Sequence, residues 1–290
     1  MTLKYRTNGF VFKKDERAES DQVFSVFTKD FGRLELKARA IRKITSKLRH
    51  DFDIFYLSEI EFIQGKNQKT LTDAVKIKKF DDVILDSQKL KAANQIADIL
   101  DDFIKGQEKD EATFDLLNEL FDNLTDRTLK IKNYCLAFQY FFWNFVSLQG
   151  YKLEVENCAI CKSKLNQYSV YNFCPAGQPV ASPQASGGNY INPAILRRSP
   201  EVTSNLRKIA QESRSDGDFY FSAEDGGIIC KNCLNQGLKQ KINSDVVKIL
   251  RLIFEKDWQT ISKLKIEPSS QKLLEDISQN AIHAFCPVHC

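Results

Sequence analysis

The sequence predicts an α+β protein with a small β-barrel over residues 1–80 and an α-helical domain over residues 81–290, which carries a four-cysteine module at about 155–234. Three observations lead to this prediction. Apolar and polar side chains alternate with the period of a strand up to about residue 80. From about residue 87, apolar side chains recur at every third or fourth position, as they do in helices. Two Cys-x-x-Cys pairs interrupt the helical part.

The first 80 residues are predicted to form five strands. The segment RLELKARA alternates strictly, with Leu34, Leu36, Ala38 and Ala40 on one face, and Gly32 suits a tight turn before it. Five strands in so short a segment suit a small barrel better than a sandwich. The predicted strands cover residues 6–14, 22–28, 33–40, 53–65 and 69–80.

The remainder of the chain is predicted to be mainly helical. Asp86 or Ser87 suits the N-cap of the first helix, and Gly150 is placed to end the third. Residues 134–148 are the most apolar run, but they are fewer than the roughly 20 residues of a membrane span, so we expect a buried helix. The predicted helices lie near residues 87–104, 114–124, 127–148, 244–258 and 268–285, with a short one at 199–213 after a Pro/Gly/Ser-rich loop at 174–193.

Composition and charge limit the classes of protein to which this chain can belong. Hydrophobic residues make up 42% of the chain and charged residues 28%, which is ordinary for a folded protein. The first residues have no apolar run typical of a signal peptide, so we expect a cytoplasmic protein without a membrane partner. The net charge of +4 divides into +7 for residues 1–80 and −3 for the rest, which indicates an anionic partner for the first domain.

The eight cysteines favour metal binding over disulfides, because the chain is long and has no secretion signal. Cys158 and Cys161 form one Cys-x-x-Cys pair, and Cys230 and Cys233 form the other. Two such pairs supply the four thiolates of a closed tetrahedral zinc site, which is structural because no coordination position is left open for a substrate. We therefore expect one Zn²⁺ per chain in a zinc-binding module.

Other interpretations of the cysteines stay open. The 68 residues 162–229 separate the pairs, against roughly 15–20 in a compact zinc ribbon, so independent thiols are one alternative. A redox dithiol fits less well, because neither pair clearly lies at the N-terminus of a helix that follows a strand. At the C-terminus, Cys286, His289 and Cys290 either bind a metal or form a chance cluster. Cys135 falls in the apolar helix and is expected in the core.

A dense cluster of positive charge begins in the third predicted strand. Residues 33–49 contain seven basic side chains and a single acidic one, Glu35. Such a density is typical of a groove that follows phosphates, and the alternative is a solvated strand face. The seven cations are Arg33, Lys37, Arg39, Arg42, Lys43, Lys47 and Arg49.

Three stretches of the chain occur in the same order in a known family. The first, GFVFKKDERAESDQVFSVFTKDFGRLELKARAIRKITSKLR at 9–49, contains an extended opening strand, an acidic and serine-containing turn, a strand and turn, and a basic strand and loop. The others are LQGYKLEVENCAIC at 148–161 and FYFSAEDGGIICKNC at 219–233. Together they resemble the RecO family, the bacterial recombination mediators of DNA repair, with residues 162–218 as an insertion between the cysteine pairs.

The resemblance implies an N-terminal OB-fold barrel and a helical domain with a zinc-binding module. It also implies binding to single-stranded and double-stranded DNA, annealing of complementary strands without ATP, and action at the nucleoid. The implied protein partners are the RecR clamp and single-stranded-DNA-binding protein, with RecA loaded as the result. By position in the family's motifs, the metal ligands would be the four paired cysteines, and the DNA-contacting residues would be the seven cations of residues 33–49.

The sequence predicts no catalytic site. It has no GxxxxGK[ST], HExxH or GxSxG motif, and its three histidines are far apart or terminal, so we expect a protein that is not an enzyme. Two other functions stay open. One is a zinc-containing RNA-binding or transcription-associated factor with the same barrel, and the other is a thiol oxidoreductase that uses the Cys-x-x-Cys pairs.

Overall fold

A computed structural model describes most of the chain and divides it into two compact units. One unit comprises residues 1–153 and 248–290, and the other comprises residues 154–247. The predicted loop at 174–193 and the predicted helix at 199–213 lie outside the described residues. The described residues are 3–17, 19–126, 134–165, 218–234, 239–255 and 258–286.

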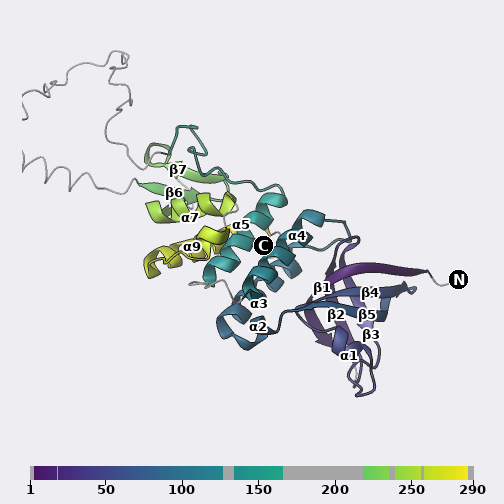
Figure 1. Ribbon diagram of the computed structural model, residues 1–290. Coiled ribbons are helices and arrows are strands. Elements are labelled where there is room, and N and C mark those ends of the chain that lie inside the picture. Colours follow the sequence, from purple (N-terminus) through teal and green to yellow (C-terminus); the bar gives the residue numbers. More distant parts are fainter. Residues whose placement is uncertain are drawn as a thin grey trace, which may run out of the picture. The chain divides into compact units, whose positions relative to one another are not determined.

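The first unit begins with five strands that close into a barrel (Figure 1). They pair in the order β1-β2-β3-β5-β4, and β4 returns to β1. All pairings are antiparallel except that of β3 with β5, which is parallel and joins only Leu36 to Lys69 and Lys37 to Thr70. The five predicted strands are confirmed to within a few residues. Their bounds are β1 Lys4–Glu16, β2 Gln22–Thr28, β3 Gly32–Ala38, β4 Tyr56–Gln64 and β5 Lys69–Lys79.

Two strands are shorter than predicted because the backbone turns at their ends. Ala40 has a φ of +53°, and its N–H donates to Asp21 Oδ1 at 2.8 Å, so β3 ends two residues early. Phe55 has a φ of +58°, and its N–H donates to the carbonyl oxygen of Val11 at 2.7 Å, so β4 begins only after it. The segment 39–55 between these two turns therefore leaves the sheet.

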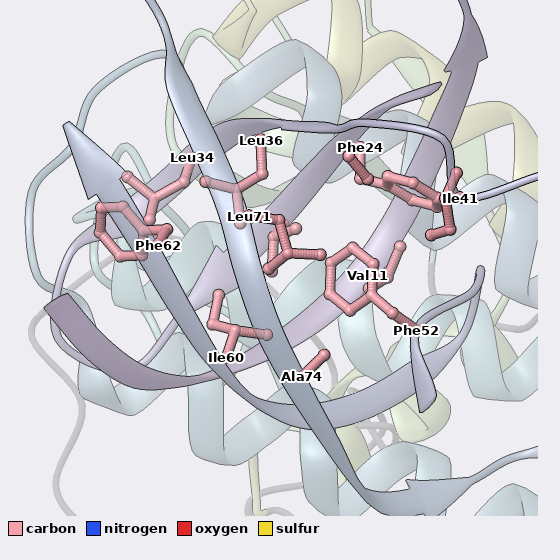
Figure 2. Packing of buried hydrophobic residues seen from close by; sticks show 12 residues of the cluster. Val11, Phe24, Leu34, Leu36, Ile41, Phe52, Ile60, Phe62, Leu71 and Ala74 are labelled. Carbon is pink, nitrogen blue, oxygen red and sulfur yellow. The ribbon is translucent and has the colours of Figure 1, made fainter. Parts of the chain in front are cut away.

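Apolar side chains fill the barrel interior (Figure 2). Leu34, Leu36 and Ala38 on β3 are fully buried, as their alternation in the sequence predicts. Ile41 and Phe52, from the two ends of the segment that leaves the sheet, belong to the same buried cluster. Burying a side chain of this size contributes about 1.5–3 kcal/mol, so both ends of the segment are held firmly against the barrel.

The longer helices follow the predicted pattern, whereas the short helices at 48–51, 81–85 and 258–261 were not predicted. Residues 127–133 of the third predicted helix lie outside the described residues. Asp86 caps α3, because its carboxylate accepts hydrogen bonds from the N–H groups of Gln88 and Lys89 at 2.9 and 3.2 Å. In α5, residues 136–146 are buried without a break, as predicted for the apolar run. Among the described residues, no helix is both long and apolar enough to cross a bilayer. The helix bounds are α1 Leu48–Asp51, α2 Asp81–Leu85, α3 Ser87–Phe103, α4 Glu111–Thr125, α5 Cys135–Leu148, α7 Ser244–Phe254, α8 Trp258–Ile261 and α9 Pro268–Phe285.

One carboxylate on α3 joins the barrel to the helices. Asp101 accepts from Lys13 at 2.7 Å and from the Arg33 guanidinium at 2.5 Å. Arg33 also donates to the carbonyl oxygens of Asp101 and Ile104, at 2.7 and 3.0 Å. Burial alone would raise the pKa of Asp101, but the hydrogen bond from Lys13 and the charge of Arg33 outweigh it and lower that pKa. The carboxylate is therefore ionised at neutral pH and pairs with both cations.

The second unit contains a small antiparallel sheet of order β7-β6-β8. These short strands were not predicted from the sequence. Gly226 and Gly227, with φ of +77° and +149°, form the bend from β6 into β7. The bounds are β6 Phe219–Ser222, β7 Gly227–Cys230, the 3₁₀ helix η2 Lys231–Cys233 and β8 Gln240–Ile242.

We expect Gly32→Ala to destabilise the barrel. Gly32 has a φ of +59°, and a Cβ at this position would overlap the backbone of Glu108. The free energy of unfolding, measured by urea denaturation, should fall by about 1–3 kcal/mol. Gly106→Ala is the control, because a Cβ there would meet no atom closer than 3.8 Å and should change stability by less than about 0.5 kcal/mol. Equal losses in both variants would contradict this explanation.

A second prediction concerns pH. The pKa of Asp101 is lower in the folded chain than its ordinary value of 3.8, so its contribution to stability is present above pH 4 and is lost on acidification. Asp101→Asn should therefore be less stable than wild type at pH 7, and the difference should shrink as the pH falls below about 4. Thermal unfolding across pH 2.5–7 measures it. Glu119→Gln, at an exposed residue of α4, is the control and should show no such trend. A stability difference for Asp101→Asn that is independent of pH would refute the prediction.

Candidate functional site

The first cysteine pair lies in a tight turn that its own backbone stabilises. The N–H of Cys158 donates to the carbonyl oxygen of Ser163 at 2.7 Å, and the N–H of Lys162 donates to the carbonyl oxygen of Cys158 at 2.9 Å. Lys162 has a φ of +60°, the left-handed conformation that reverses the chain just after Cys161. The turn therefore brings two sulfur atoms together from positions three residues apart.

The second pair lies where β7 passes into η2, with Cys230 at the end of the strand and Cys233 in the 3₁₀ helix. Backbone hydrogen bonds hold the two pairs together within the second unit. The N–H of Ala159 donates to the carbonyl oxygen of Ile228 at 2.8 Å, and the N–H of Ile228 donates to Glu154 at 2.9 Å. The separation of 68 residues in the sequence is thus bridged by direct contact between the flanks of the pairs.

Glycine is required at one point of this contact. Glu154 and Gly227 form a parallel bridge, and the N–H of Glu154 donates to the carbonyl oxygen of Gly226 at 2.9 Å. A Cβ on Gly227 would overlap the backbone of Glu154, and the φ of +149° disfavours any other residue. The glycines therefore let the strand approach close enough for the second pair to reach the first.

The four sulfur atoms have the spacing of a metal site. The Sγ atoms of Cys158, Cys161, Cys230 and Cys233 all lie within 4.8 Å of one another, and those of Cys161 and Cys230 are 3.8 Å apart. A tetrahedral zinc ion with Zn–S bonds of about 2.3 Å places its sulfurs about 3.8 Å apart. The four cysteines are free thiols, since a disulfide would need about 2.05 Å. This donor set and this spacing fit Zn²⁺.

The protonation of the cluster also suits a cation. Hydrogen bonds from the hydroxyl and the N–H of Ser163 lower the pKa of Cys161 to about 6, and the hydroxyl lies 2.9 Å from the sulfur. Burial raises the pKa of Cys158, but backbone N–H groups, among them that of Cys230, lower it overall. Cys233 donates a hydrogen bond to Cys161, and this bond is the main reason why the pKa of Cys233 is raised to about 12. The cluster thus carries negative charge and retains protons that a metal ion would displace.

The remaining described cysteines do not join the cluster. Cys135 is half-buried and its thiol donates to Glu275 at 3.1 Å, and desolvation together with this carboxylate raises the pKa of the thiol to about 12. Cys286 is buried and directs its thiol toward the carbonyl oxygen of Asp102 at 3.7 Å. Its predicted companions His289 and Cys290 lie outside the described residues, so the alternative terminal metal site stays a prediction.

The seven cations of residues 33–49 do not share one surface. The side chain of Arg33 is 14% exposed, and its guanidinium donates hydrogen bonds to Asp101 on α3 and to Ile104, the residue after that helix. Arg33 is therefore a residue of the contact between the barrel and the helices, and the expectation that it contacts DNA is revised. Lys37 pairs with Asp21 at 3.1 Å, and Arg42 pairs with Glu16 at 3.2 Å.

The other four cations extend from the segment that leaves the sheet. All four are exposed, and within the described part of the chain they form no ion pair. The segment is pinned by hydrogen bonds from the N–H of Arg42 to Ser20 at 3.2 Å and from the N–H of Lys43 to Ala40 at 3.1 Å. Residues 39–49 are called the basic loop below. The four of its cations that pair with no acidic group among the described residues are Arg39, Lys43, Lys47 and Arg49.

Some residues of the site were not found from the sequence. Ser163, which hydrogen-bonds Cys161, was not singled out, although its place two residues after a Cys-x-x-Cys pair was a usable signal. Glu154, which holds the second pair in place, carried no signal, because its role depends on a backbone contact with Gly227.

Comparison with known proteins identifies relatives for both parts of the chain. Residues 1–80 match the family model for the N-terminal part of recombination protein O, and residues 85–216 match the model for its C-terminal part. The DNA repair protein RecO of Dehalococcoides mccartyi is 26% identical, over 90% of this chain and 83% of that protein. The protein of the same name from Halalkalibacterium halodurans is 20% identical, over 98% of this chain and 91% of its own length.

The two family models together cover most of the chain, in the order in which the barrel and the helices occur. The four-cysteine cluster is compatible with zinc. The chain belongs to the RecO family of DNA repair and recombination proteins.

Proposed function

We propose that this protein binds single-stranded and double-stranded DNA through the basic loop of its barrel and anneals complementary strands without ATP. The observation that carries the proposal is the cluster of exposed cations between Arg39 and Arg49, four of which form no ion pair within the described residues, in a chain of a DNA repair family. Cations presented by a firmly anchored loop attract phosphates of any base sequence, because the attraction is electrostatic. With one strand held by its phosphates, its bases stay free to pair.

Annealing needs neither a covalent step nor a nucleotide cofactor. Two DNA strands repel each other through their phosphates, and a cationic surface that contacts both lowers this repulsion. We propose that the protein is a recombination mediator and not an enzyme. In this proposal it acts at the bacterial nucleoid with RecR and single-stranded-DNA-binding protein, and so helps RecA to load.

The proposed architecture assigns residues 1–80 to an OB-fold domain and residues 81–290 to a helical domain, with a zinc-binding module at about 155–234. Five strands in a closed order support the OB-fold, which is a barrel of this size that binds nucleic acids. We propose that Cys158, Cys161, Cys230 and Cys233 hold one Zn²⁺. The ion would supply structural cross-linking of two chain segments, since four protein ligands leave no place for a substrate.

Elemental analysis tests whether the four cysteines bind zinc. Wild-type protein should contain one zinc per chain, and Cys161→Ser or Cys233→Ser should lose it, whereas Cys135→Ser should keep it because that thiol donates to Glu275 instead. Zinc affinity should fall as the pH decreases, since protons compete for the thiolates. A folded wild-type protein purified without zinc, and unable to bind it, would exclude the proposed ion.

DNA binding is tested with oligonucleotides over a range of salt. If about four cations contact phosphate, log K should fall against log salt with a slope of roughly −3 for single strands. Arg39→Ala/Arg42→Ala/Lys43→Ala should weaken binding to every base sequence alike, and should slow the annealing of oligonucleotides coated with single-stranded-DNA-binding protein. Three exposed lysines around α9 provide a control of equal charge, Lys263→Ala/Lys265→Ala/Lys272→Ala.

The outcomes separate this proposal from its alternatives. A slope near zero would eliminate the electrostatic account, and equal loss in the control variant would show that only net charge matters. Wild-type protein that binds RNA more tightly than DNA and anneals no coated strands would favour the RNA-binding alternative. Disulfide reductase activity in a protein that contains no zinc would favour the oxidoreductase.

A further inference from the structure

The basic loop carries three large apolar side chains, and the middle one lies outside the barrel core. Ile41 is 3% exposed and belongs to the buried cluster (Figure 2), and Leu48 packs against the same cluster. Ile44, between them, is 89% exposed, which is the highest value for a large apolar side chain among the described residues. The loop therefore holds onto the barrel with two of its apolar residues and presents the third to solvent.

Two consecutive turns of the backbone fix the position of Ile44. The N–H of Lys43 donates to the carbonyl oxygen of Ala40 at 3.1 Å, and the N–H of Ser46 donates to the carbonyl oxygen of Lys43 at 3.0 Å. Ile44 is thus the second residue of the turn 43–46. Small and polar residues and proline dominate such turns, and an exposed β-branched side chain gains no packing energy there. The fold itself therefore gives no reason for isoleucine at this position.

Positive charge lies on both sides of this residue in the chain. Lys43 precedes Ile44 and Lys47 follows it, and both lysines are exposed and pair with no acidic group among the described residues. The sequence from 36 to 50 contains neither aspartate nor glutamate. Ile44 is therefore an apolar side chain in a part of the surface that attracts anions.

A partner that satisfies this surface must offer negative charge and an apolar face side by side. The acidic side chains of a protein would pair with the lysines but leave Ile44 in water. A DNA duplex offers phosphates, but its base faces are stacked on one another, and opening a step costs free energy. A single DNA strand offers both features, because its unstacked bases expose their faces beside the phosphates.

We propose that Ile44 contacts the face of an unstacked base in a bound single DNA strand, while Lys43 and Lys47 contact its phosphates. This inference rests on the proposed function, since it assumes that the basic loop binds DNA. It adds a preference for single strands over duplex, which cations alone do not explain. Because isoleucine has no hydrogen-bonding side-chain group, it covers a base face and leaves the pairing edge of that base free for the complementary strand.

The contact is tested with Ile44→Ser and a labelled oligothymidylate. Affinity should fall by roughly threefold to tenfold, because apolar area is no longer buried on binding. The slope of log K against log salt should not change, since no charge is removed, and affinity for a duplex of the same length should also stay the same. Leu85→Ser is the matched control, because Leu85 is 83% exposed on α2, outside the basic loop, and should bind all of these DNAs as wild type does.

An oligonucleotide of the same length without bases isolates the contact with the base. It keeps the phosphates but offers no base face, so wild type and Ile44→Ser should bind it equally. Ile44→Phe provides a variant with the opposite effect, since an aromatic ring stacks on bases better than an aliphatic chain, and it should bind oligothymidylate more tightly than wild type. Thermal unfolding verifies that each variant is folded, and Ile44→Thr, which keeps the β-branched shape, replaces the serine variant if that one unfolds.

The outcomes distinguish this inference from the proposed function. If Arg39→Ala/Arg42→Ala/Lys43→Ala loses DNA binding but Ile44→Ser binds oligothymidylate as wild type does, the inference is wrong and the proposed function stands. If Ile44→Ser weakens binding to the duplex or to the strand without bases by the same factor, the contact with a base is refuted. If Ile44→Ser loses binding only to vesicles of phosphatidylglycerol, the side chain serves an anionic membrane and the inference also fails. If wild-type protein binds DNA with a slope near zero, the proposed function itself falls.

Discussion

Burial of the barrel interior is the constraint from which the arrangement of the first unit follows. Because alternate side chains of β3 are fully buried, the intervening positions must lie outside. The same core also takes in Ile41 and Phe52, which are the two ends of the segment that leaves the sheet. Because both ends of this segment are buried, its position on the barrel is fixed and the cations between the ends stay in solvent. Their mutual repulsion is a cost in folding free energy. That cost is offset by the apolar burial, which is why the sequence can concentrate cations there.

The second unit depends on a different kind of constraint. Its sheet has three strands of three or four residues each, and a sheet of this size has little stability in isolation. Its described backbone is closed by the contact of Glu154 with Gly227 and by the approach of four sulfurs. A bound metal ion would cross-link the two cysteine pairs and so stabilise this small unit. The barrel of the first unit is thus held by an apolar core, and the second unit additionally brings four thiols together.

Much of the fold was predictable because its signals are local. The strict alternation of RLELKARA, the capping Asp86 and the apolar run of α5 each determine structure within one segment. The cysteine pairs were also recognisable, because a two-residue spacer is a local pattern. The strands β6, β7 and β8 were missed, since segments of three or four residues are too short to show a period.

What the sequence could not supply was the environment of each side chain. Arg33 and Arg39 look alike in the sequence, yet one is bound to Asp101 and the other is exposed without an ion pair in the described residues. That distinction depends on where α3 packs, which is a property of the whole first unit. The exposure of Ile44 was overlooked for a similar reason, because Ile41, Ile44 and Leu48 are all apolar and only the packing of the basic loop on the barrel separates them.

The contact between Glu154 and Gly227 has one more consequence, for the history of the chain. It fixes both cysteine pairs through residues that lie a few positions before each pair, so the sulfur geometry does not depend on how many residues join Leu165 to Asp218. Closing a flexible connection twice as long costs only about 0.6 kcal/mol more. The interval between the pairs is therefore a place where related chains can differ widely in length while the cluster itself stays the same.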